Sequence, residues 1–333
     1  MKNTNYDDEI NILIDEFLKR ENITKDELLE TLQAVGNTFV GRGYYDLAEK
    51  YFQRSVAIGK ELNRMKNVAF GMGYIGNIHR AKGDLDQALR YLESTLEIHK
   101  EIGYKQGEAS VLGNIGQVYS DKGDLDQALR YLESALEIDR KVYGEEHPAV
   151  ATMLNNLGGA YDSLGDYKKA IEYYEKALSI AEKIYGEEHP SVATMFNNLG
   201  LAWDSLGDSN RAIEYYEKAL EIDRKVYGEE HPAVARDLNN LGLAWDSLGD
   251  YRKAIKYYEK ALEIDRKAYG ERHLYATGTL GNLGMAWLSL QNPRKAIEYI
   301  QKAYTISQEI LGENHPNTRF AKEMLDTLQE EFK

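Results

Sequence analysis

The fold is decided by residues 193–234, which read ATMFNNLGLAWDSLGDSNRAIEYYEKALEIDRKVYGEEHPAV, and by residues 235–276, which read ARDLNNLGLAWDSLGDYRKAIKYYEKALEIDRKAYGERHLYA. The two segments are identical at 30 of 42 positions. The tetrad Asn-Asn-Leu-Gly, or a close variant of it, begins at a spacing of 42 residues at Asn155, Asn197, Asn239 and Gly281. A fixed period of this length predicts an array in which one supersecondary unit is repeated.

The same unit extends towards the N-terminus, where the period shortens to 40 residues. A glycine recurs in every unit, at Gly36, Gly76, Gly116, Gly158, Gly200, Gly242 and Gly284. An alanine follows each glycine twelve positions later, at Ala48, Ala88, Ala128, Ala170, Ala212, Ala254 and Ala296. We therefore expect seven units, with limits at 29–68, 69–108, 109–150, 151–192, 193–234, 235–276 and 277–316. Residues 1–28 and 317–333 are expected to cap the two ends of the array.

One unit reads as two helices joined by a tight turn. Pro148 suits the first turn of a helix, because its missing N–H would be unpaired there in any case. Gly165 ends this helix as a residue that adopts positive φ without strain. Asp166 is then placed to cap the second helix by accepting a free backbone N–H. Gly186 ends the second helix, and the next His-Pro pair opens the next unit.

The two ends of the chain depart from the repeat. Residues 8–20 have an apolar face at helical spacing and predict an amphipathic helix. Thr24 and Glu27 have the spacing of a capping box at the start of the next helix. Residues 317–332 predict a last helix. Its apolar side is expected to cover the seventh unit with Phe320, Met324, Leu325 and Leu328.

The composition excludes several classes of function. The formal net charge is −14, with 55 acidic and 41 basic residues. No basic stripe is present, so direct binding of nucleic acid is not expected. The chain has no cysteine, which excludes disulfides and thiolate metal sites. No stretch approaches eighteen apolar residues, and the N-terminus lacks the features of a signal peptide. We therefore expect a cytoplasmic protein that does not bind a membrane.

The repeat carries a family resemblance. Residues 154–161, with the pattern L-x-x-L-G-x-x-Y, and residues 170–174, with the pattern A-x-x-x-Y, resemble the tetratricopeptide repeat signature. The sequence Tyr-Gly-Glu-Glu-His-Pro at 143–148, 185–190 and 227–232 looks like the kinesin-light-chain type of this repeat. The resemblance implies an all-α fold: a right-handed superhelix, or α-solenoid, of about seven helical hairpins with terminal capping helices.

Two patterns suggest chemistry at first sight. Histidines recur at His147, His189, His231, His273 and His315. A metal needs ligands that converge within about 2.1 Å of one ion, whereas equivalent residues of an array are separated by a whole repeat. Gly71, Gly73 and Gly76 spell G-x-G-x-x-G, but the repeat places them inside a helix with no strand before it. We therefore expect no metal, no cofactor and no catalytic residues, and interpret the histidines as turn residues.

The resemblance also suggests which residues bind a partner. In the family, the first helices of successive hairpins line a concave groove. The corresponding residues here are Asn114, Asn155, Asn156, Asp162, Asn197, Asn198, Leu201, Asp204, Asn239, Asn240, Leu243, Asp246, Asn282 and Met285. Asparagine both donates and accepts hydrogen bonds, so a row of asparagines suits an extended peptide backbone. The alternative is that these asparagines only brace neighbouring repeats.

These observations predict a non-catalytic scaffold or adaptor that binds an extended peptide or a helix in its groove. The acidic and apolar groove residues predict a protein or peptide partner with basic and apolar side chains. A second hypothesis is a regulatory subunit that senses a peptide by a change of superhelix shape. An enzyme with an unrecognised site is the third. Family members that clamp a carboxylate use lysine and arginine, for which only Arg80 and Arg236 stand at suitable positions.

Overall fold

The computed structural model describes residues 23–271 and 273–332, and these residues form helices and no strand. The helices are α2 (Lys25–Gly41), α3 (Tyr45–Glu61), α4 (Met65–Ala81), α5 (Leu85–Glu101), α6 (Lys105–Lys122), α7 (Leu125–Tyr143), α8 (Pro148–Ser163), α9 (Tyr167–Tyr185), α10 (Pro190–Ser205), α11 (Ser209–Tyr227), α12 (Pro232–Ser247), α13 (Tyr251–Tyr269), α14 (Tyr275–Ser289), α15 (Pro293–Leu311) and α16 (Pro316–Glu331). The all-α fold that the family resemblance implies is confirmed.

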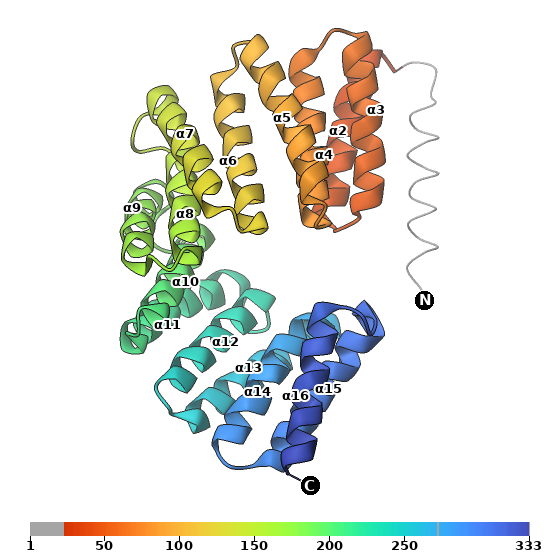
Figure 1. Cartoon of the computed structure of the whole chain (residues 1–333). Helices are drawn as coiled ribbons and strands as arrows, with labels where there is room; N and C mark the ends of the chain where they lie inside the picture. The colour runs from red at the N-terminus through yellow and green to blue at the C-terminus, as the bar shows by residue number, and fades with distance from the viewer. Residues whose placement is uncertain (1–22, 272, 333) are drawn as a thin grey trace. The chain divides into compact units, whose positions relative to one another are not determined.

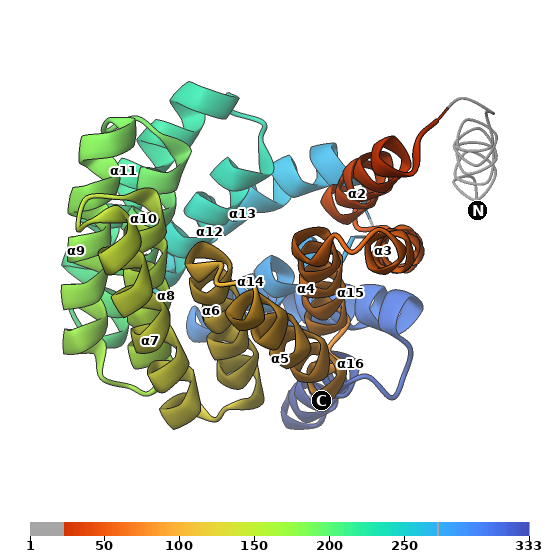
Figure 2. The same cartoon turned by 90° about the horizontal axis from the view of Figure 1, so that it is seen from above.

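The chain divides into two compact units, one up to Glu145 and one from Glu146. The first contains α2 to α7 and the second contains α8 to α16. Within each unit, consecutive helices pair as hairpins whose two helices lie side by side (Figure 1, Figure 2). The part of the chain that the structure describes forms seven hairpins, from α2 with α3 to α14 with α15. Each begins a few residues before the unit limit set by the period.

Caps at both ends set the helix limits in each hairpin, as α8 and α9 show. His147 precedes Pro148, and its Nδ1 accepts a hydrogen bond from the backbone N–H of Ala149 at 3.2 Å. Gly165 has a φ of +83° and terminates the first helix. The Asp166 carboxylate accepts the backbone N–H of Lys169 at 3.3 Å and caps α9. The predicted roles of the proline, glycine and aspartate are confirmed.

The recurring glycine allows the two helices of a hairpin to approach closely. A Cβ on Gly158 would lie 2.5 Å from Cε1 of Tyr174, whose ring is buried against this glycine. The other repeat glycines meet the side chain sixteen positions later in the same way, namely Phe52, Leu92, Leu132, Tyr216, Tyr258 and Ile300. The recurring alanines are all fully buried. The core of each hairpin therefore depends on small residues in fixed register.

Two adjacent glycines of α8 test this packing. Gly158→Ala is expected to lower the free energy of unfolding by about 1–3 kcal/mol, because the new methyl group overlaps the Tyr174 ring. Gly159→Ala is expected to raise it by up to about 1 kcal/mol, because alanine favours helix. At Gly159 a Cβ would lie 3.6 Å from the Tyr174 hydroxyl, which is an ordinary contact. Urea unfolding followed by circular dichroism measures both. Changes of the same sign would contradict the packing.

The two ends of the chain agree in part with the expectations from the sequence. The amphipathic helix predicted for residues 8–20 lies outside the described residues. The capping box is confirmed, since Thr24 and Glu27 exchange side-chain and backbone hydrogen bonds at the start of α2. The last helix is confirmed as α16, with Leu325 and Leu328 buried against the seventh hairpin. Phe320 was expected to cover the same core, but it is 64% exposed.

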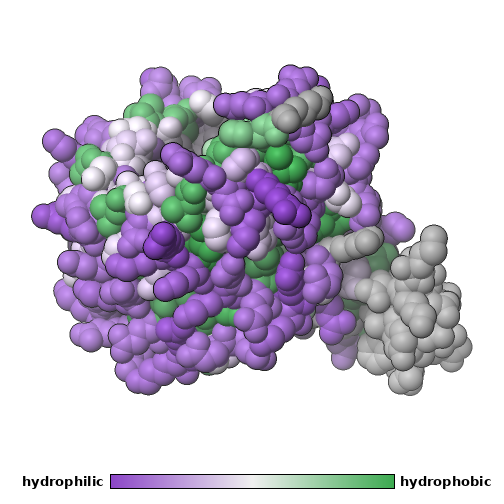
Figure 3. Space-filling model, turned by 90° about the horizontal axis from the view of Figure 1, so that it is seen from below, coloured by the Kyte–Doolittle hydropathy of each residue, from purple (hydrophilic) through white to green (hydrophobic). Residues whose placement is uncertain are grey.

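The surface is mainly hydrophilic and carries separate apolar patches, several of which are visible on the face in Figure 3. Exposed apolar side chains include Leu201, Met285 and Phe320. None of the helices in the described part of the chain is long and apolar enough to cross a bilayer.

Candidate binding face

The first helices of successive hairpins form one face of the unit that begins at Glu146. Neighbouring first helices contact one another, α8 with α10, α10 with α12 and α12 with α14. No pair of second helices in the described residues of this unit approaches as closely. The face made by α8, α10, α12 and α14 is therefore its inner, more closely spaced side, and it carries most of the candidate residues.

The asparagines of this face form a ladder between repeats. Each rung is a hydrogen bond from Nδ2 of one asparagine to Oδ1 of an asparagine in the preceding repeat. The rungs are Asn198 to Asn155 at 2.8 Å, Asn240 to Asn197 at 3.0 Å and Asn282 to Asn239 at 3.2 Å. The bracing role, which the sequence left as the alternative, is therefore present in the structure.

Asn197 differs from its neighbours because it is buried, with 6% of its surface exposed. Its Nδ2 donates to the backbone oxygen of Ala193 at 3.3 Å and to Oδ1 of Asp237 at 2.7 Å. Its Oδ1 accepts the rung from Asn240. Both of its N–H groups are thus used within the protein, so its expected contact with a partner is replaced by a structural role.

The other rungs leave hydrogen-bonding capacity for a ligand. Asn198 and Asn240 are half-buried, and the ladder uses one N–H of each. An amide side chain has two N–H groups and a carbonyl oxygen, so the second N–H and the oxygen remain. Nδ2 of Asn156 is buried without a partner among the described residues. Asn114 lies half-buried on α6, in the unit that ends at Glu145.

The three aspartates proposed for the groove are half-buried rather than fully exposed. Asp204 accepts hydrogen bonds from the hydroxyl groups of Ser209 at 2.5 Å and Ser247 at 3.2 Å. Burial raises the pKa of Asp162 and of Asp246 above the usual value for a carboxyl group. Oδ1 of each of these two has no partner within the described part of the chain. These two oxygens are therefore buried acceptors without a donor, and a cation approaching this face would meet only the exposed part of each half-buried side chain.

Apolar side chains accompany the aspartates. Leu201 is 48% exposed and Met285 is 43% exposed. Leu243 is half-buried and packs against the core between α13 and α14. A pocket of about 450 Å³ between α14, α15 and α16 is lined by Asn282, Met285 and Phe320 among others. The face thus combines amide, acidic and apolar groups.

Sequence reasoning missed a buried charge cluster at the edge of this face. Nη2 of Arg236 lies 3.0 Å from Oδ2 of Asp223 and 3.1 Å from Oδ1 of Asp237. Both aspartates are buried. Burial raises the pKa of Asp237 to about 7, and the charge of Asp223 adds to this, although Arg236 opposes it. The sequence contained one indication of this cluster: Asp237 is an exception among the repeats, because Met153 and Met195 occupy its position in the two preceding repeats.

The arginines that stood at carboxylate-clamp positions are both paired within the protein. Arg236 holds Asp223 and Asp237, and Arg80 pairs with Asp121 and Gln117. Both guanidinium groups therefore already hold acidic side chains of the protein itself.

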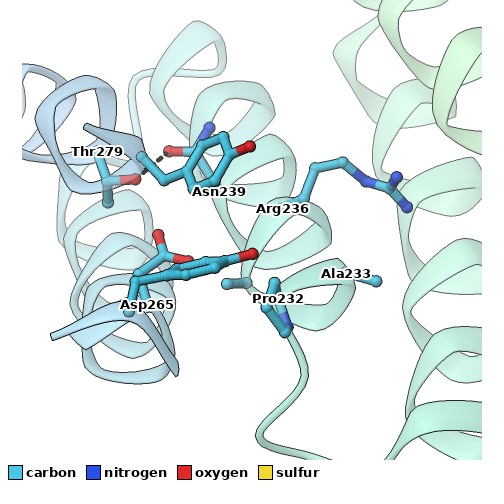
Figure 4. Close-up of a pocket in the computed structure, with 9 residues that line it drawn as sticks. Pro232, Ala233, Arg236, Asn239, Asp265 and Thr279 are labelled. Atoms are coloured by element: carbon cyan, nitrogen blue, oxygen red, sulfur yellow. Dashed lines mark hydrogen bonds between the residues drawn. The ribbon is translucent and has the colours of Figure 1, made fainter. Parts of the chain in front are cut away.

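A pocket of about 470 Å³ lies next to this cluster, between α12, α13 and α14. Figure 4 shows its lining residues, of which it labels Pro232, Ala233, Arg236, Asn239, Asp265 and Thr279. Oδ1 of Asn239 accepts a hydrogen bond from the Thr279 hydroxyl at 3.3 Å. Asp265 lines the pocket with 8% of its surface exposed.

The recurring histidines stabilise turns. Nδ1 of His189 accepts the backbone N–H of Ser191 at 3.1 Å, and its ring stacks on Tyr185 with centroids 4.5 Å apart. His147, His231, His273 and His315 accept a backbone N–H two residues later in the same way. Among the described residues, no group of three histidine, aspartate or glutamate side chains is arranged to hold a metal ion.

Comparison with known sequences identifies the family of the repeat. The sequence profile of the tetratricopeptide repeat matches residues 67–141, 107–183, 163–225, 205–267 and 245–306. Together these matches span well over half of the chain. No curated protein matches the chain.

Solved structures show the same architecture. BtubC (BKLC) from P. vanneervenii is 26% identical, covers 70% of this chain and 94% of its own, and gives a TM-score of 0.60. A putative kinesin light chain from Podosopora anserina, with nearly identical TPR-like repeats, is 24% identical, with coverages of 60% and 94% and a TM-score of 0.51. The apo form of RapI is 20% identical, with coverages of 92% and 82% and a TM-score of 0.66.

Proposed function

We propose, from the premise that this chain belongs to the tetratricopeptide repeat family, that it is a scaffold or adaptor that holds an extended segment of another protein along α8, α10, α12 and α14. Members of the family generally mediate protein–protein interactions, and the fold is typically non-catalytic. We place this interaction in the cytoplasm. The partner remains defined by the chemistry of the face and not by the identity of any similar protein.

The observation that carries the proposal is the asparagine ladder. Each rung fixes the orientation of a half-buried amide, and Asn198 and Asn240 keep an N–H and a carbonyl oxygen outside the ladder. An extended peptide presents N–H and C=O groups along its length, and these lose water when the peptide binds. A row of oriented amides at the spacing of the repeats supplies partners for those groups at little additional entropic cost.

The side chains around the ladder favour particular partner residues. Asp162 and Asp246 are half-buried carboxylates, so the exposed part of each side chain suits lysine or arginine. Exposed Leu201 and Met285, together with the pocket beside Phe320, offer apolar contacts. We therefore propose a bound segment in which basic and apolar side chains alternate along a backbone held by the ladder.

The test compares double variants for binding to the native partner, which affinity capture and mass spectrometry would first identify. Asp204→Asn with Asp246→Asn is expected to slow association and reduce its dependence on salt, since charges mainly steer encounter. Asn198→Ala with Asn240→Ala is expected to speed dissociation by about tenfold, because backbone groups of the ligand lose their partners. Surface plasmon resonance at two salt concentrations separates the two rates.

The matched control lies on the other face. Glu217 and Glu259 are exposed, occupy equivalent positions of α11 and α13, and line shallow depressions between second helices. Glu217→Gln with Glu259→Gln is expected to bind as the wild type does. If this control loses binding while both groove variants retain it, the partner docks on the second helices and the proposal fails.

The regulatory alternative makes one additional prediction. A subunit that senses a peptide through its shape would change its radius of gyration when the partner segment binds, whereas a scaffold would keep it. Small-angle scattering with and without the segment distinguishes the two.

A further inference from the structure

One repeat contains a buried carboxylate, Asp265, that forms no ion pair with the other residues that the structure describes. Arg236 follows Asp223 by thirteen positions and pairs with it across the junction of two repeats. In the next repeat, Asp265 stands where Asp223 stood, and Gly278 stands where Arg236 stood. The second junction therefore keeps the buried acid and replaces the arginine with a residue that has no side chain.

The carboxylate of Asp265 is placed to bind a cation from outside. Only 8% of its surface is exposed, and it lines the pocket between α12, α13 and α14. Among residues 23–271 and 273–332, none forms an ion pair or hydrogen bond with it. Burial raises its pKa, and a positive charge on nearby His273 acts in the opposite direction. A buried acid in this setting is stabilised by a cation that also donates hydrogen bonds.

Arg236 does not fill this role, although it also lines the pocket. Figure 4 shows its side chain extending away from Asp265. Its guanidinium is held by Asp223 and Asp237 on the other side of α12. A Cβ on Gly278 would meet no atom within 4 Å, so a side chain can begin at this position without a clash.

The walls of the pocket suit a flat cation. The rings of Tyr269 and Tyr275 lie with their centroids 5.0 Å apart, and both are exposed. Tyr275 stands where Ala149, Ser191 and Ala233 stand in the three preceding repeats. Aromatic faces attract cations and stack on the guanidinium plane of arginine in particular. At this junction Leu274 and Tyr275 replace the proline and the small residue of the three preceding repeats. Arg236 is itself particular to the preceding junction, because Thr152 and Thr194 occupy its position in the two repeats before it.

We propose that the pocket of Asp265, Tyr269 and Tyr275 is a specificity site that receives an arginine side chain of the bound partner, whose guanidinium takes the place that Arg236 takes at Asp223. This inference rests on the proposed function and adds one defined contact to it. Asn239 lines the same pocket, and its oxygen accepts hydrogen bonds from Thr279 and Asn282. Its side-chain N–H groups donate to none of the described residues, so they can bind the partner backbone next to the arginine.

The binding test uses a small probe and does not need the partner. N-acetyl-arginine methylamide is titrated into the isotope-labelled chain, and the backbone amide resonances of Tyr275 and Thr279, which line the pocket, report on binding. The citrulline analogue has the same shape without the charge, and it is expected to bind at least about tenfold more weakly. The lysine analogue is expected to bind more weakly than arginine, because it lacks the planar fork.

Variants of the pocket complete this test. Asp265→Asn and Gly278→Arg are each expected to abolish the saturable shifts, whereas Gly278→Ala is expected to retain them. The proposal is overturned if citrulline or lysine binds as well as arginine, if Asp265→Asn still binds the probe, or if no saturable shift appears.

A second measurement tests the pocket through stability alone. Gly278→Arg is expected to melt at a higher temperature than Gly278→Ala, because the new arginine pairs with Asp265 as Arg236 pairs with Asp223. Asp265→Asn is expected to remove this difference. If the difference persists in the Asp265→Asn background, the arginine does not reach this carboxylate and the inference fails.

The two proposals fail in distinguishable ways. If the probe binds but Asp265→Asn leaves the native partner unaffected, the site exists and the partner does not use it. If the probe does not bind while the ladder variants weaken partner binding, the proposed function stands without this site.

Discussion

Replacing Arg236 with alanine is expected to lower the free energy of unfolding by about 2–4 kcal/mol at pH 8. The guanidinium holds two buried carboxylates, Asp223 and Asp237, and its removal leaves both without a cation. Breaking a fully buried pair costs about 3–5 kcal/mol, and the range here is lower because the Arg236 side chain is 47% exposed. Urea unfolding followed by circular dichroism measures the loss.

The same variant is expected to lose less stability at pH 5, where the Asp237 carboxyl group is protonated in the folded chain. Arg252→Ala is the matched control, because Arg252 is an exposed residue of α13. Its expected effect is within about 0.5 kcal/mol at both pH values. Equal effects of the two variants would show that Arg236 contributes nothing beyond an ordinary surface charge.

The stability of the wild type is expected to fall as the pH rises from about 4 to about 7. Burial raises the pKa of Asp237 to about 7, whereas an unfolded aspartate titrates near ~3.9. Between these values the folded chain retains a proton that the unfolded chain has released, so raising the pH favours unfolding. A difference of about three pKa units corresponds to up to about 4 kcal/mol.

Asp237→Met, which restores the residue of the preceding repeats, is expected to reduce this fall substantially. Part of it remains, since burial also raises the pKa of Asp223 and Asp265. Urea midpoints at pH 5 and pH 8 measure the change. The exposed Asp326 supplies the control Asp326→Asn, which should keep the wild-type dependence. A dependence unchanged by Asp237→Met would show that the pKa of Asp237 is close to its unfolded value.

The helices were predictable because their determinants are local. Pro148, Gly165 and Asp166 act on the backbone within a few residues of themselves, and the sequence shows each of them directly. The recurring glycine and alanine were predictable for a related reason. Their positions repeat, and only a small residue fits where two helices approach closely.

The side-chain chemistry of the face was less predictable, because it depends on contacts between repeats. The position of Asn197 indicated an amide on the inner side, but its burial follows from Asp237, a residue of the next repeat. A consensus sequence of the repeats does not show such pairs of residues. They become visible where one repeat departs from the others, as Asp237 departs from Met153 and Met195, and Arg236 from Thr152 and Thr194.

The pairing of Asp223 with Arg236 has a genetic consequence. Segments as alike as 193–234 and 235–276 can recombine, and the loss of one would leave the helical pattern uninterrupted. If residues 193–234 were lost as a block, Ala181 would stand thirteen positions before Arg236, where Asp223 stands now, and Arg236 would lose one of its two carboxylates. A shortened gene would therefore encode a chain with a correct period but an impaired junction. Selection against the impaired junction would then keep the number of repeats constant. The period alone would not do so, because it is unchanged when a whole repeat is lost.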